Sequence, residues 1–418
     1  MTEPERGSAS RPALSRCIRV SADTFADEYW GRKPLLSTAD ELGAGFDDLF
    51  SAAAVDELVT SRGVRTPFIR MAHEGAVLAA SDYTAPGGYG AEVADQVSSD
   101  KVLDEFADGA TIVLQGLHRL WPPISDFTRA LVDDLGHPAQ VNAYVTPPSS
   151  QGFEAHYDTH DVFVLQISGE KHWRIHAPVH ADPLRSQPWT DHRAAVARAA
   201  TGEPVIDALL GPGDALYLPR GWIHSATALG ATSVHLTVGM SAYTRADLVQ
   251  ALVDEASDHA GLRASLPLGI DVSDPASIAP IVEETVRELV DALQATDAAW
   301  PAAVLSRRFD ADTRAEPLAP LATLDALAAL DAGTRVRWRA SSHARIVTVD
   351  DRVRVVSRAK TLSLPIEAEP ALRRIAEGEP VAVGELPGLD PESAIVVARR
   401  LVREGFVVPV PVPVAAPE

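Results

Sequence analysis

The sequence is poor in cysteine, and this scarcity excludes several classes of protein. Cys17 is the only cysteine among 418 residues, so no disulfide can form within the chain. Secreted domains that depend on disulfides are therefore excluded, and a reducing compartment is favoured. Hydrophobic residues make up 46% of the sequence, which is enough for a large core without such cross-links.

Long apolar runs and an excess of basic residues are missing as well. No apolar run reaches the roughly 18 residues that a membrane-spanning helix needs. The polar stretch from Met1 to Cys17 lacks the hydrophobic segment of a signal peptide. We therefore expect a cytoplasmic protein with no membrane partner. The net charge of -21 disfavours binding of nucleic acid over the whole surface, because an acidic body repels phosphate.

The pattern of apolar residues predicts a β-rich domain over residues 19–242, after a mobile tail at residues 1–18. Short runs with β-branched and aromatic residues alternate with Gly, Pro and Asp, which is typical of strands in a barrel or a sandwich. The predicted strands are 111–115, 140–145, 162–167, 171–175, 214–218 and 233–238. Helices are expected before them, at 46–61 and 124–134.

The composition changes after residue 242 to favour helices. Residues 243–334 are rich in Ala, Leu, Val, Asp and Glu, and the stretches 245–256 and 275–293 have helical spacing. Thr244 and Asp274 are suited to cap these two helices. Their apolar faces need a partner, either the barrel or a second copy of the chain, so we interpret 243–334 as a helical domain.

The pattern changes again over residues 335–410. A hairpin, two helices and a final strand are expected at 345–357, 370–377, 391–404 and 406–410, in an order that resembles a winged-helix unit. The predicted helix 391–404 carries three cations beside two glutamates, whereas a DNA-recognition helix usually has a more basic face. We therefore expect no direct binding of nucleic acid. Residues 411–418 read as a Pro-rich tail.

One group of residues suggests metal chemistry. His156 and Asp158 are two positions apart, so in an extended strand both side chains point to the same face. The later stretch GDALYLPRGWIH (213–224) has a turn, a short apolar strand, a Pro/Gly turn and then His224. An antiparallel barrel can bring His224 opposite the first pair.

Two histidines and one carboxylate on one side of a metal leave coordination positions open. This facial arrangement favours Fe(II) in oxygenases, although the same ligands also accept Mn²⁺, Co²⁺ or Zn²⁺. Each half of the pattern is weak by itself, because a lone His-x-Asp is usually a pair on the protein surface. The two halves together, at a spacing that one barrel can close, favour a metal site at His156, Asp158 and His224.

The residues around this group resemble a known family. The segment QVNAYVTPPSSQGFEAHYDTHDVFVLQISGEKHWRI (140–175) is similar to the cupin-type JmjC oxygenases and, more narrowly, to the ribosomal oxygenases, which hydroxylate ribosomal proteins. The stretch FADEYWGRKPLL (25–36) resembles the entry segment of that family. The resemblance implies an α+β fold: a double-stranded β-helix barrel, then a helical dimerisation domain and a winged-helix-like domain, hence a homodimer.

The resemblance also implies roles for individual residues. His156, Asp158 and His224 match the family's iron ligands. Lys171 matches the basic residue that pairs with the far carboxylate of 2-oxoglutarate, and a dicarboxylate bound to iron at one end does need a cation at the other. Asn142 and Tyr144 match positions beside the metal and the co-substrate. His235 and Thr237 could also face the cavity, although we interpret His235 as a core histidine.

The activity implied is hydroxylation of a protein side chain that consumes 2-oxoglutarate and O₂. The metal centre carries the difficult step, so no general base is needed at the substrate carbon. The expected substrate is a basic ribosomal protein, which the acidic chain could attract by its charge. In the family that the sequence resembles, the bacterial arginine hydroxylase has arginine at the position of Lys171, whereas the histidine hydroxylases have lysine. The hydroxylated residue therefore stays open between arginine and histidine.

Two other interpretations remain open. A cupin oxygenase that acts on a small metabolite would have the same metal ligands, but it needs a closed pocket rather than an open groove. A metal-sensing or metabolite-sensing protein that binds DNA through the winged-helix-like end would not be an enzyme at all. Salt-dependent binding to duplex DNA would favour this second alternative.

Overall fold

The computed structural model describes residues 11–410, apart from residues 74, 91 and 149–153. The chain divides into two compact units, Met1–Ala242 and Tyr243–Glu418. We describe each unit by itself. In the described part of the chain, no helix is both long enough and apolar enough to cross a bilayer.

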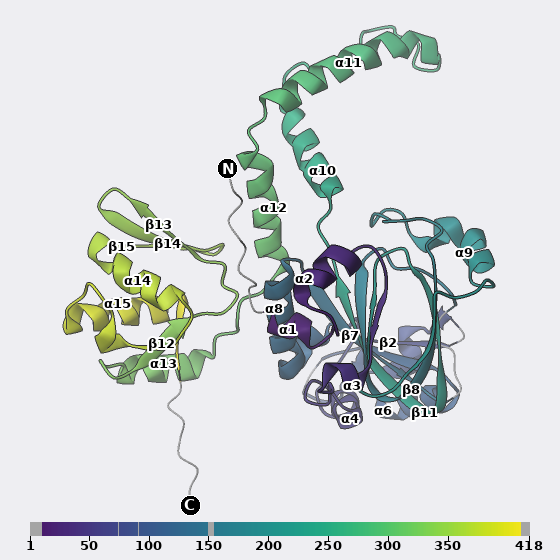
Figure 1. Cartoon of the computed structure of the whole chain (residues 1–418), viewed down its shortest axis with the longest axis horizontal. Helices are drawn as coiled ribbons and strands as arrows, with labels where there is room; N and C mark the ends of the chain where they lie inside the picture. Colours follow the sequence, from purple (N-terminus) through teal and green to yellow (C-terminus); the bar gives the residue numbers. More distant parts are fainter. Residues whose placement is uncertain (1–10, 74, 91, 149–153, 411–418) are drawn as a thin grey trace, which may run out of the picture. The chain divides into compact units, whose positions relative to one another are not determined.

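Among the described residues, the first unit contains a nine-stranded antiparallel sheet (Figure 1). Its central strands are the two long ones, β8 (Asp161–His176) and β11 (Ile223–Met240), which pair with each other along most of their length. The order across the sheet is β1 (Leu35–Ser37), β10 (Ala215–Leu218), β8, β11, β7 (Ala139–Thr146), β6 (Thr111–Leu114), β2 (Ile69–His73) and β3 (Ala76–Val77). The ninth strand, β9 (Ile206–Leu210), pairs with the second half of β8.

The two long strands bend where their register breaks. The first half of β8 pairs with the second half of β11, and its second half pairs with the first half of β11, with an irregularity between Leu229 and Val234. Gly169 lies at this bend with φ +65°, and a Cβ there would collide with the carbonyl oxygen of Thr232. Only glycine fits such a close approach of two backbones. The predicted strands 162–167 and 171–175 are therefore two halves of one bent strand.

Strand β7 shows how the alternation of side chains separates the core from the cavity. Val141, Ala143 and Val145 belong to the main hydrophobic core, to which α8 (Pro122–Leu135) and the helices α4 (Ala52–Thr60) and α6 (Ser99–Ala107) also contribute. Because successive residues of a strand point to opposite faces, Asn142, Tyr144 and Thr146 point away from these helices. Asn142, Tyr144 and Thr146 thus lie on the face of β7 opposite the main core, and Tyr144 on this face lines a cavity.

The prediction of a mobile tail through residue 18 is wrong for the part that the structure describes. Residues 12–15 form α1 (Pro12–Ser15), the Leu14 backbone N–H donates to the Asp134 carboxylate over 2.9 Å, and Leu14 and Cys17 are each only 1% exposed. Polar residues surround a short apolar pattern in this segment, which is why the sequence reads as a polar tail. Its apolar residues, Ala13, Leu14, Cys17 and Ile18, pack into the main core. Burial raises the pKa of the Cys17 thiol to about 12.

The second unit begins with helices. They are α10 (Arg245–Ala256), α11 (Pro275–Ala295), α12 (Ala299–Asp312) and α13 (Pro320–Ala329). The Thr244 side chain accepts a hydrogen bond from the Asp247 backbone, and the Asp274 side chain accepts one from Ala276, so both predicted caps are present. Helix α10 contacts both α11 and α12.

Small sheets and two helices complete the second unit. One sheet has the order β16 (Val381–Ala382), β12 (Arg335–Trp338) and β17 (Val407–Pro409), and the other has the order β13 (Arg345–Val349), β14 (Arg352–Val356) and β15 (Thr361–Pro365). They share a hydrophobic core with α14 (Glu369–Ala376) and α15 (Pro391–Arg403). Leu327 and Leu330, at the end of α13, pack against the same core, so α13 belongs structurally with this part of the unit. The predicted tail at 411–418 lies outside the described residues.

Candidate metal centre

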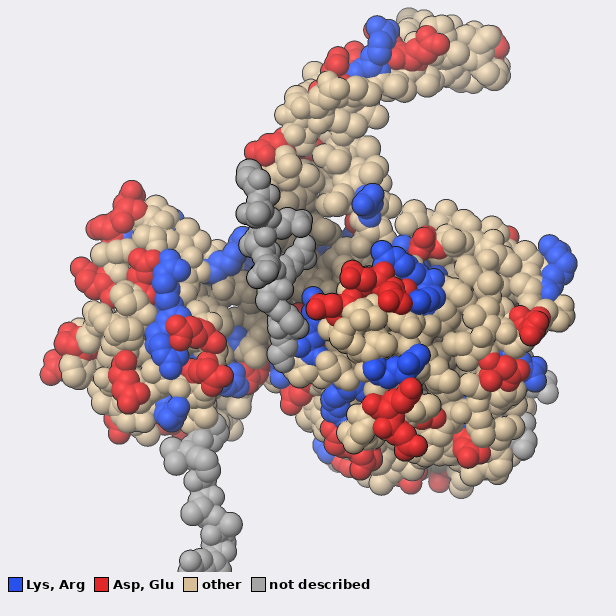
Figure 2. Space-filling view, in the orientation of Figure 1, with Lys and Arg blue, Asp and Glu red and all other residues tan. Residues whose placement is uncertain are grey.

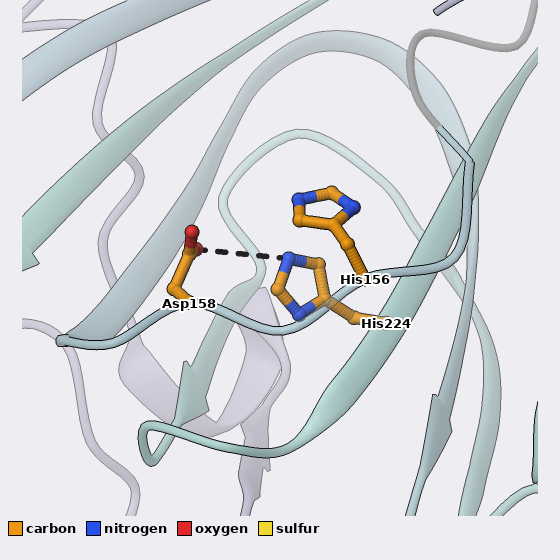
Figure 3. A group of neighbouring side chains, drawn as sticks. All are labelled: His156, Asp158 and His224. Carbon is orange, nitrogen blue, oxygen red and sulfur yellow. Dashed lines mark ion pairs between the residues drawn. The ribbon is translucent and has the colours of Figure 1, made fainter. Parts of the chain in front are cut away.

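Two histidines and one aspartate meet inside the first unit (Figure 3). His156 and Asp158 lie just before β8, and His224 is the second residue of β11. Two backbone hydrogen bonds join the segments, from His156 N to His224 O at 3.1 Å and from His224 N to His156 O at 2.8 Å. One potential ligand atom from each residue lies within 4.8 Å of the other two. The structure thus brings together the three residues that the spacing singled out.

The orientation of both imidazoles suits metal binding. His156 Nδ1 lies 2.7 Å from the carbonyl oxygen of Glu154, and His224 Nδ1 lies 3.0 Å from that of Trp222. Since a carbonyl oxygen only accepts, each Nδ1 must carry the proton and donate. A neutral ring then has its lone pair on Nε2, which is how metal-binding histidines are commonly held.

The electrostatics favour a neutral His224 and an ionised Asp158. Burial and then His156 lower the pKa of His224 to about 4, against the opposing effect of Asp158. Burial by itself would raise the pKa of Asp158, but the imidazoles of His160, His224 and His156 bring it below its ordinary value. At neutral pH the 3.8 Å contact between His224 Nε2 and Asp158 Oδ2 therefore joins a neutral ring to a carboxylate. These are the protonation states that a divalent cation needs.

The donor set fits a divalent transition metal with positions left open. Two imidazole nitrogens and one carboxylate on one side of a site are the ligands found in non-haem iron oxygenases. The Asp158 side chain is 31% exposed, whereas that of His224 is 11% exposed. The site therefore opens to solvent on the Asp158 side, and His224 forms its deeper wall.

A cavity continues inward from the three residues and ends near a buried lysine. Lys171 is 3% exposed, and its Nζ donates to Thr146 Oγ1 over 3.1 Å. Burial lowers the pKa of Lys171 to about 7. Within the described residues no carboxylate forms an ion pair with it, so an anion that enters the cavity would supply the missing counter-charge. The apolar part of the lining consists of Val162, Val164, Trp173, Leu218 and Ala226.

The structure separates the two residues predicted beside the co-substrate. Tyr144 lines the cavity, and burial raises the pKa of its hydroxyl. Asn142 lies on the same face of β7, but its side-chain oxygen accepts a hydrogen bond from the Gly116 backbone over 3.0 Å. The carboxamide of Asn142 thus supports the turn before α7 (Leu117–Leu120) and is not part of the cavity lining.

His235 and Thr237 both line the cavity. The ring of His235 stacks on Tyr144 with a centroid distance of 5.1 Å and an interplanar angle of 5°, and the two residues are paired across β7 and β11. His235 Nδ1 is buried and has no hydrogen-bond partner in the part of the chain that the structure describes. Burial and then Lys171 lower the pKa of His235, so the ring is neutral. Its position next to Lys171 makes it a part of the cavity rather than of the core alone.

Asp161 is a structural residue of the site that the sequence pattern did not reveal. It is 1% exposed, and its carboxylate accepts hydrogen bonds from the Tyr217 hydroxyl at 2.9 Å and from the Arg220 backbone at 2.8 Å. Burial raises the pKa of Asp161. The carboxylate ties the start of β8 to the turn that leads to His224. The only signal in the sequence was an acid directly before the predicted strand 162–167.

We expect Asp161→Ala to reduce the free energy of unfolding by about 2 to 3 kcal/mol, because two buried donors lose their acceptor. Chemical denaturation of the purified chain measures this. Asp207→Ala is the matched control, since Asp207 is an exposed aspartate of the same unit, and its loss should change stability by less than about 1 kcal/mol. Equal effects of the two substitutions would show that the carboxylate of Asp161 is not a structural link.

Comparison with known proteins assigns a class to this site. Residues 119–248 match the model of the JmjC domain. The segment includes His156, Asp158, Lys171 and His224. The chain therefore contains a JmjC domain of the cupin type with mixed α and β content, as the resemblance of the sequence implied.

Two relatives with curated names show to which JmjC proteins the chain is similar. The chain is 33% identical over 227 residues to ribosomal oxygenase 1 of Gallus gallus, an alignment that covers 54% of this chain and 35% of that protein. It is 31% identical over 265 residues to the bifunctional lysine-specific demethylase and histidyl-hydroxylase NO66 of Drosophila persimilis, which covers 59% of this chain and 35% of the relative. The aligned region thus spans about a third of each relative. The resemblance to ribosomal oxygenases is confirmed.

Solved structures with a similar fold include a ribosomal oxygenase. YcfD, a ribosomal oxygenase from Escherichia coli, superposes with a TM-score of 0.51 and 18% identity, covering 94% of this chain and 99% of YcfD. A second structure of YcfD, in complex with cobalt and 2-oxoglutarate, gives the same TM-score, identity and coverage. At this identity the similarity concerns the fold.

Proposed function

We propose that this protein is an Fe(II)- and 2-oxoglutarate-dependent oxygenase that hydroxylates a side chain of a ribosomal protein. The observation that carries the proposal is one cavity with a cation-binding group at its mouth and, at its inner end, a buried amine that forms an ion pair with no carboxylate of the described residues. The His156, Asp158 and His224 ligand atoms lie within 4.8 Å of one another, and Lys171 is almost fully buried among neutral groups. A molecule that chelates a metal at one end and carries a carboxylate at the other suits both ends.

Each residue of the cavity has a role in this proposal. His156, Asp158 and His224 would hold Fe(II), with their Nδ1 hydrogen bonds keeping both rings in the binding tautomer. Lys171 would bind the far carboxylate of 2-oxoglutarate, and Thr146 positions its ammonium group. His235, whose buried Nδ1 has no hydrogen-bond partner among the described residues, and Tyr144, stacked on it, would provide further polar contacts to the co-substrate.

The chemistry places few demands on the protein beyond binding. Bound Fe(II), 2-oxoglutarate and O₂ together supply an oxidant for a C–H bond, with succinate and CO₂ as the other products. The apolar side chains of Val162, Val164 and Leu218 keep water away from the inner part of the cavity. No side chain has to remove a proton from the substrate carbon.

The similarity to named ribosomal oxygenases and the charge of the chain support a ribosomal protein as the substrate. The relatives include a protein named as a histidyl-hydroxylase, and the lysine at position 171 is the residue expected in histidine hydroxylases. The net charge of -21 favours encounter with a basic protein. We propose histidine or arginine as the hydroxylated residue and the cytoplasm as the setting.

The test is turnover by the full chain loaded anaerobically with Fe(II). Succinate release is measured with 2-oxoglutarate and O₂, in the presence and in the absence of purified ribosomal proteins. We expect ribosomal proteins to stimulate succinate release, and mass spectrometry to find one added oxygen on a histidine or an arginine. Stimulation by small metabolites alone, with no oxidised protein, would contradict the proposed substrate and favour the metabolite oxygenase.

We also propose that residues 243–334 mediate a homodimer through the helices that precede α13, and that residues 335–410, on whose core α13 packs, form a winged-helix-like unit. Val282, Val286 and Val290 follow one another at helical spacing on α11, and they are 52%, 51% and 44% exposed. Figure 2 shows uncharged surface beside acidic and basic side chains on this helix. An exposed row of valines on one helix face indicates a surface that another apolar face covers, and a second copy of the same helix would provide one.

We expect the double variant Val282→Glu/Val286→Glu to weaken self-association at least about tenfold, because the interface would have to bury charges without partners. Light scattering during size-exclusion chromatography measures the mass across a range of concentrations. Glu284→Gln, an exposed change on another face of α11, is the control that should leave the mass unchanged. A wild-type chain that is monomeric at all concentrations would refute the dimer.

A further inference from the structure

The segment between β8 and β9 covers the edge of the metal centre. It contains a 3₁₀ turn, η2 (Trp189–His192), and α9 (Arg193–Ala199). Tyr157, which lies between the ligands His156 and Asp158, packs with Val196 and Ile223, and its hydroxyl donates to the Gln187 carbonyl over 3.2 Å. The segment is therefore attached to residues that are direct neighbours of the metal ligands.

Trp189 and Glu154 lie at this edge, and both contact the guanidinium group of Arg193. The Trp189 ring lies 6.1 Å from the ring of His156, centroid to centroid. The guanidinium carbon of Arg193 lies 4.4 Å above the Trp189 ring, and Arg193 Nη1 lies 3.4 Å from Glu154 Oε2. An aromatic face and a carboxylate thus converge on one guanidinium group beside the metal site.

Arg193 is held weakly where it lies. Its side chain is 59% exposed and that of Glu154 is 73% exposed. Exposed ion pairs contribute at most about 1 kcal/mol, and an exposed cation–π contact contributes a similar amount. A cationic ligand of the same chemistry can therefore displace Arg193 without disturbing the core.

We propose that Trp189 and Glu154 form a subsite for a cationic side chain, arginine or lysine, of the protein substrate, and that Arg193 occupies this subsite until the substrate arrives. The inference rests on the proposed function for the identity of the ligand as a substrate. It adds a determinant of specificity: the substrate carries a positive charge close to the residue that enters the metal site.

The distance from the metal centre sets where this charge lies in the substrate. The Glu154 backbone carbonyl holds the ring of His156, so the subsite is in fixed register with a metal ligand. Consecutive residues of an extended peptide span about 3.3 to 3.6 Å each. The 6.1 Å between the two rings is within the reach of an arginine or lysine side chain, so the cation belongs to a residue close to the target residue in the peptide.

The experiment measures binding rather than turnover. Fluorescence anisotropy follows a short labelled peptide of alternating glycine and arginine, mixed with the full chain, and the comparison peptide has citrulline in place of arginine. The informative variants are Glu154→Gln, Trp189→Leu and Arg193→Ala. Arg198→Ala, an exposed arginine of the same helix, and Glu203→Gln, an exposed glutamate of the same unit, are the charge-matched controls.

We expect the arginine peptide to bind more tightly than the citrulline peptide. Glu154→Gln and Trp189→Leu should each weaken its binding about fivefold, and Arg193→Ala should strengthen it about fivefold, because the internal competitor is gone. The two controls should change it less than twofold. If Trp189→Leu loosens the packing of α9, Glu154→Gln and Arg193→Ala still decide the question, since both positions are exposed.

Several results would overturn the subsite. They are equal binding of the two peptides, weaker or unchanged binding with Arg193→Ala, and a gain with Arg198→Ala as large as that with Arg193→Ala. Failure of the proposed function would look different. In that case the peptide would bind with the expected pattern, but succinate release would stay absent with every ribosomal protein.

Discussion

Replacing His224 with alanine is expected to lower succinate formation more than about 100-fold and to remove tightly bound metal from the chain. His224 forms the deep wall of the metal centre, and a site with one imidazole and one carboxylate retains too few ligands to hold Fe(II). Metal analysis after anaerobic reconstitution and dialysis, together with the succinate assay, measures both effects.

The control is a histidine of the same unit that faces elsewhere. His172 lies on β8 and contacts Asp207 on the neighbouring strand β9, away from the cavity lining. His172→Ala should retain both the metal and the activity within about twofold. A His224→Ala variant that keeps one metal ion per chain and normal turnover would refute the metal centre and, with it, the proposed oxygenase.

The second large effect concerns Lys171, for which stability and function should change in opposite directions. Lys171→Met is expected to abolish measurable binding of 2-oxoglutarate, because the far carboxylate would lose its counter-charge. The same variant should raise the free energy of unfolding on the order of 2 kcal/mol at pH 7, because an amine no longer has to be buried among neutral groups. Calorimetric titration and chemical denaturation measure the two quantities.

The pH dependence distinguishes this explanation from simple repacking. The pKa of Lys171 is lowered from 10.5 to about 7, so between these values the unfolded chain binds more protons than the folded chain. Stability of the wild type therefore rises from pH 7 towards pH 10.5, and the advantage of Lys171→Met should shrink over that range. Lys33→Met, at an exposed lysine, should show neither effect. An advantage of Lys171→Met that is constant with pH would contradict the burial of charge.

The affinity for 2-oxoglutarate should follow the same titration. Below pH 7 the ammonium group of Lys171 is present in the free protein, whereas above pH 7 a proton must be taken up when the dianion binds. The dissociation constant should therefore increase above pH 7 by up to about tenfold per pH unit. Affinity that is flat between pH 6 and 9 would show that Lys171 is not the cation that binds the co-substrate.

The sequence predicted the individual strands and the metal-site residues better than it predicted how the strands pair with one another. His156 and Asp158 could be predicted as a pair because residues two apart in an extended segment share one face, which is local geometry, although the structure places them just before β8 and not within a strand. The bend at Gly169 could not be found, since glycine there is required by the Thr232 carbonyl of a strand more than sixty residues away. Pairing across strands, rather than preference along one strand, determines such positions.

Two side chains have contacts that only the packed structure reveals. Asn142 was predicted beside the metal and the co-substrate from the family resemblance and from its strand face, and the structure adds that its side-chain oxygen accepts a hydrogen bond from the Gly116 backbone. His235 was interpreted as a core histidine, yet it lines the cavity together with Lys171, and its Nδ1 finds no hydrogen-bond partner in the described ranges of the chain. The alternation of side chains along a strand predicts the face on which a residue lies, but it does not predict the hydrogen-bond partner of that residue.

The buried thiol near the start of the chain has a practical consequence for spectroscopy. Cys17 is the only sulfhydryl group in the sequence, it is 1% exposed, and its pKa of about 12 leaves almost no thiolate at neutral pH. Maleimide dyes and thiol-reactive nitroxide spin labels react with the thiolate, so we expect very little labelling of the native protein at Cys17. One cysteine introduced at Arg198 on α9 would accept a label selectively, and its distance to a paramagnetic ion in the metal centre could then be followed during substrate binding.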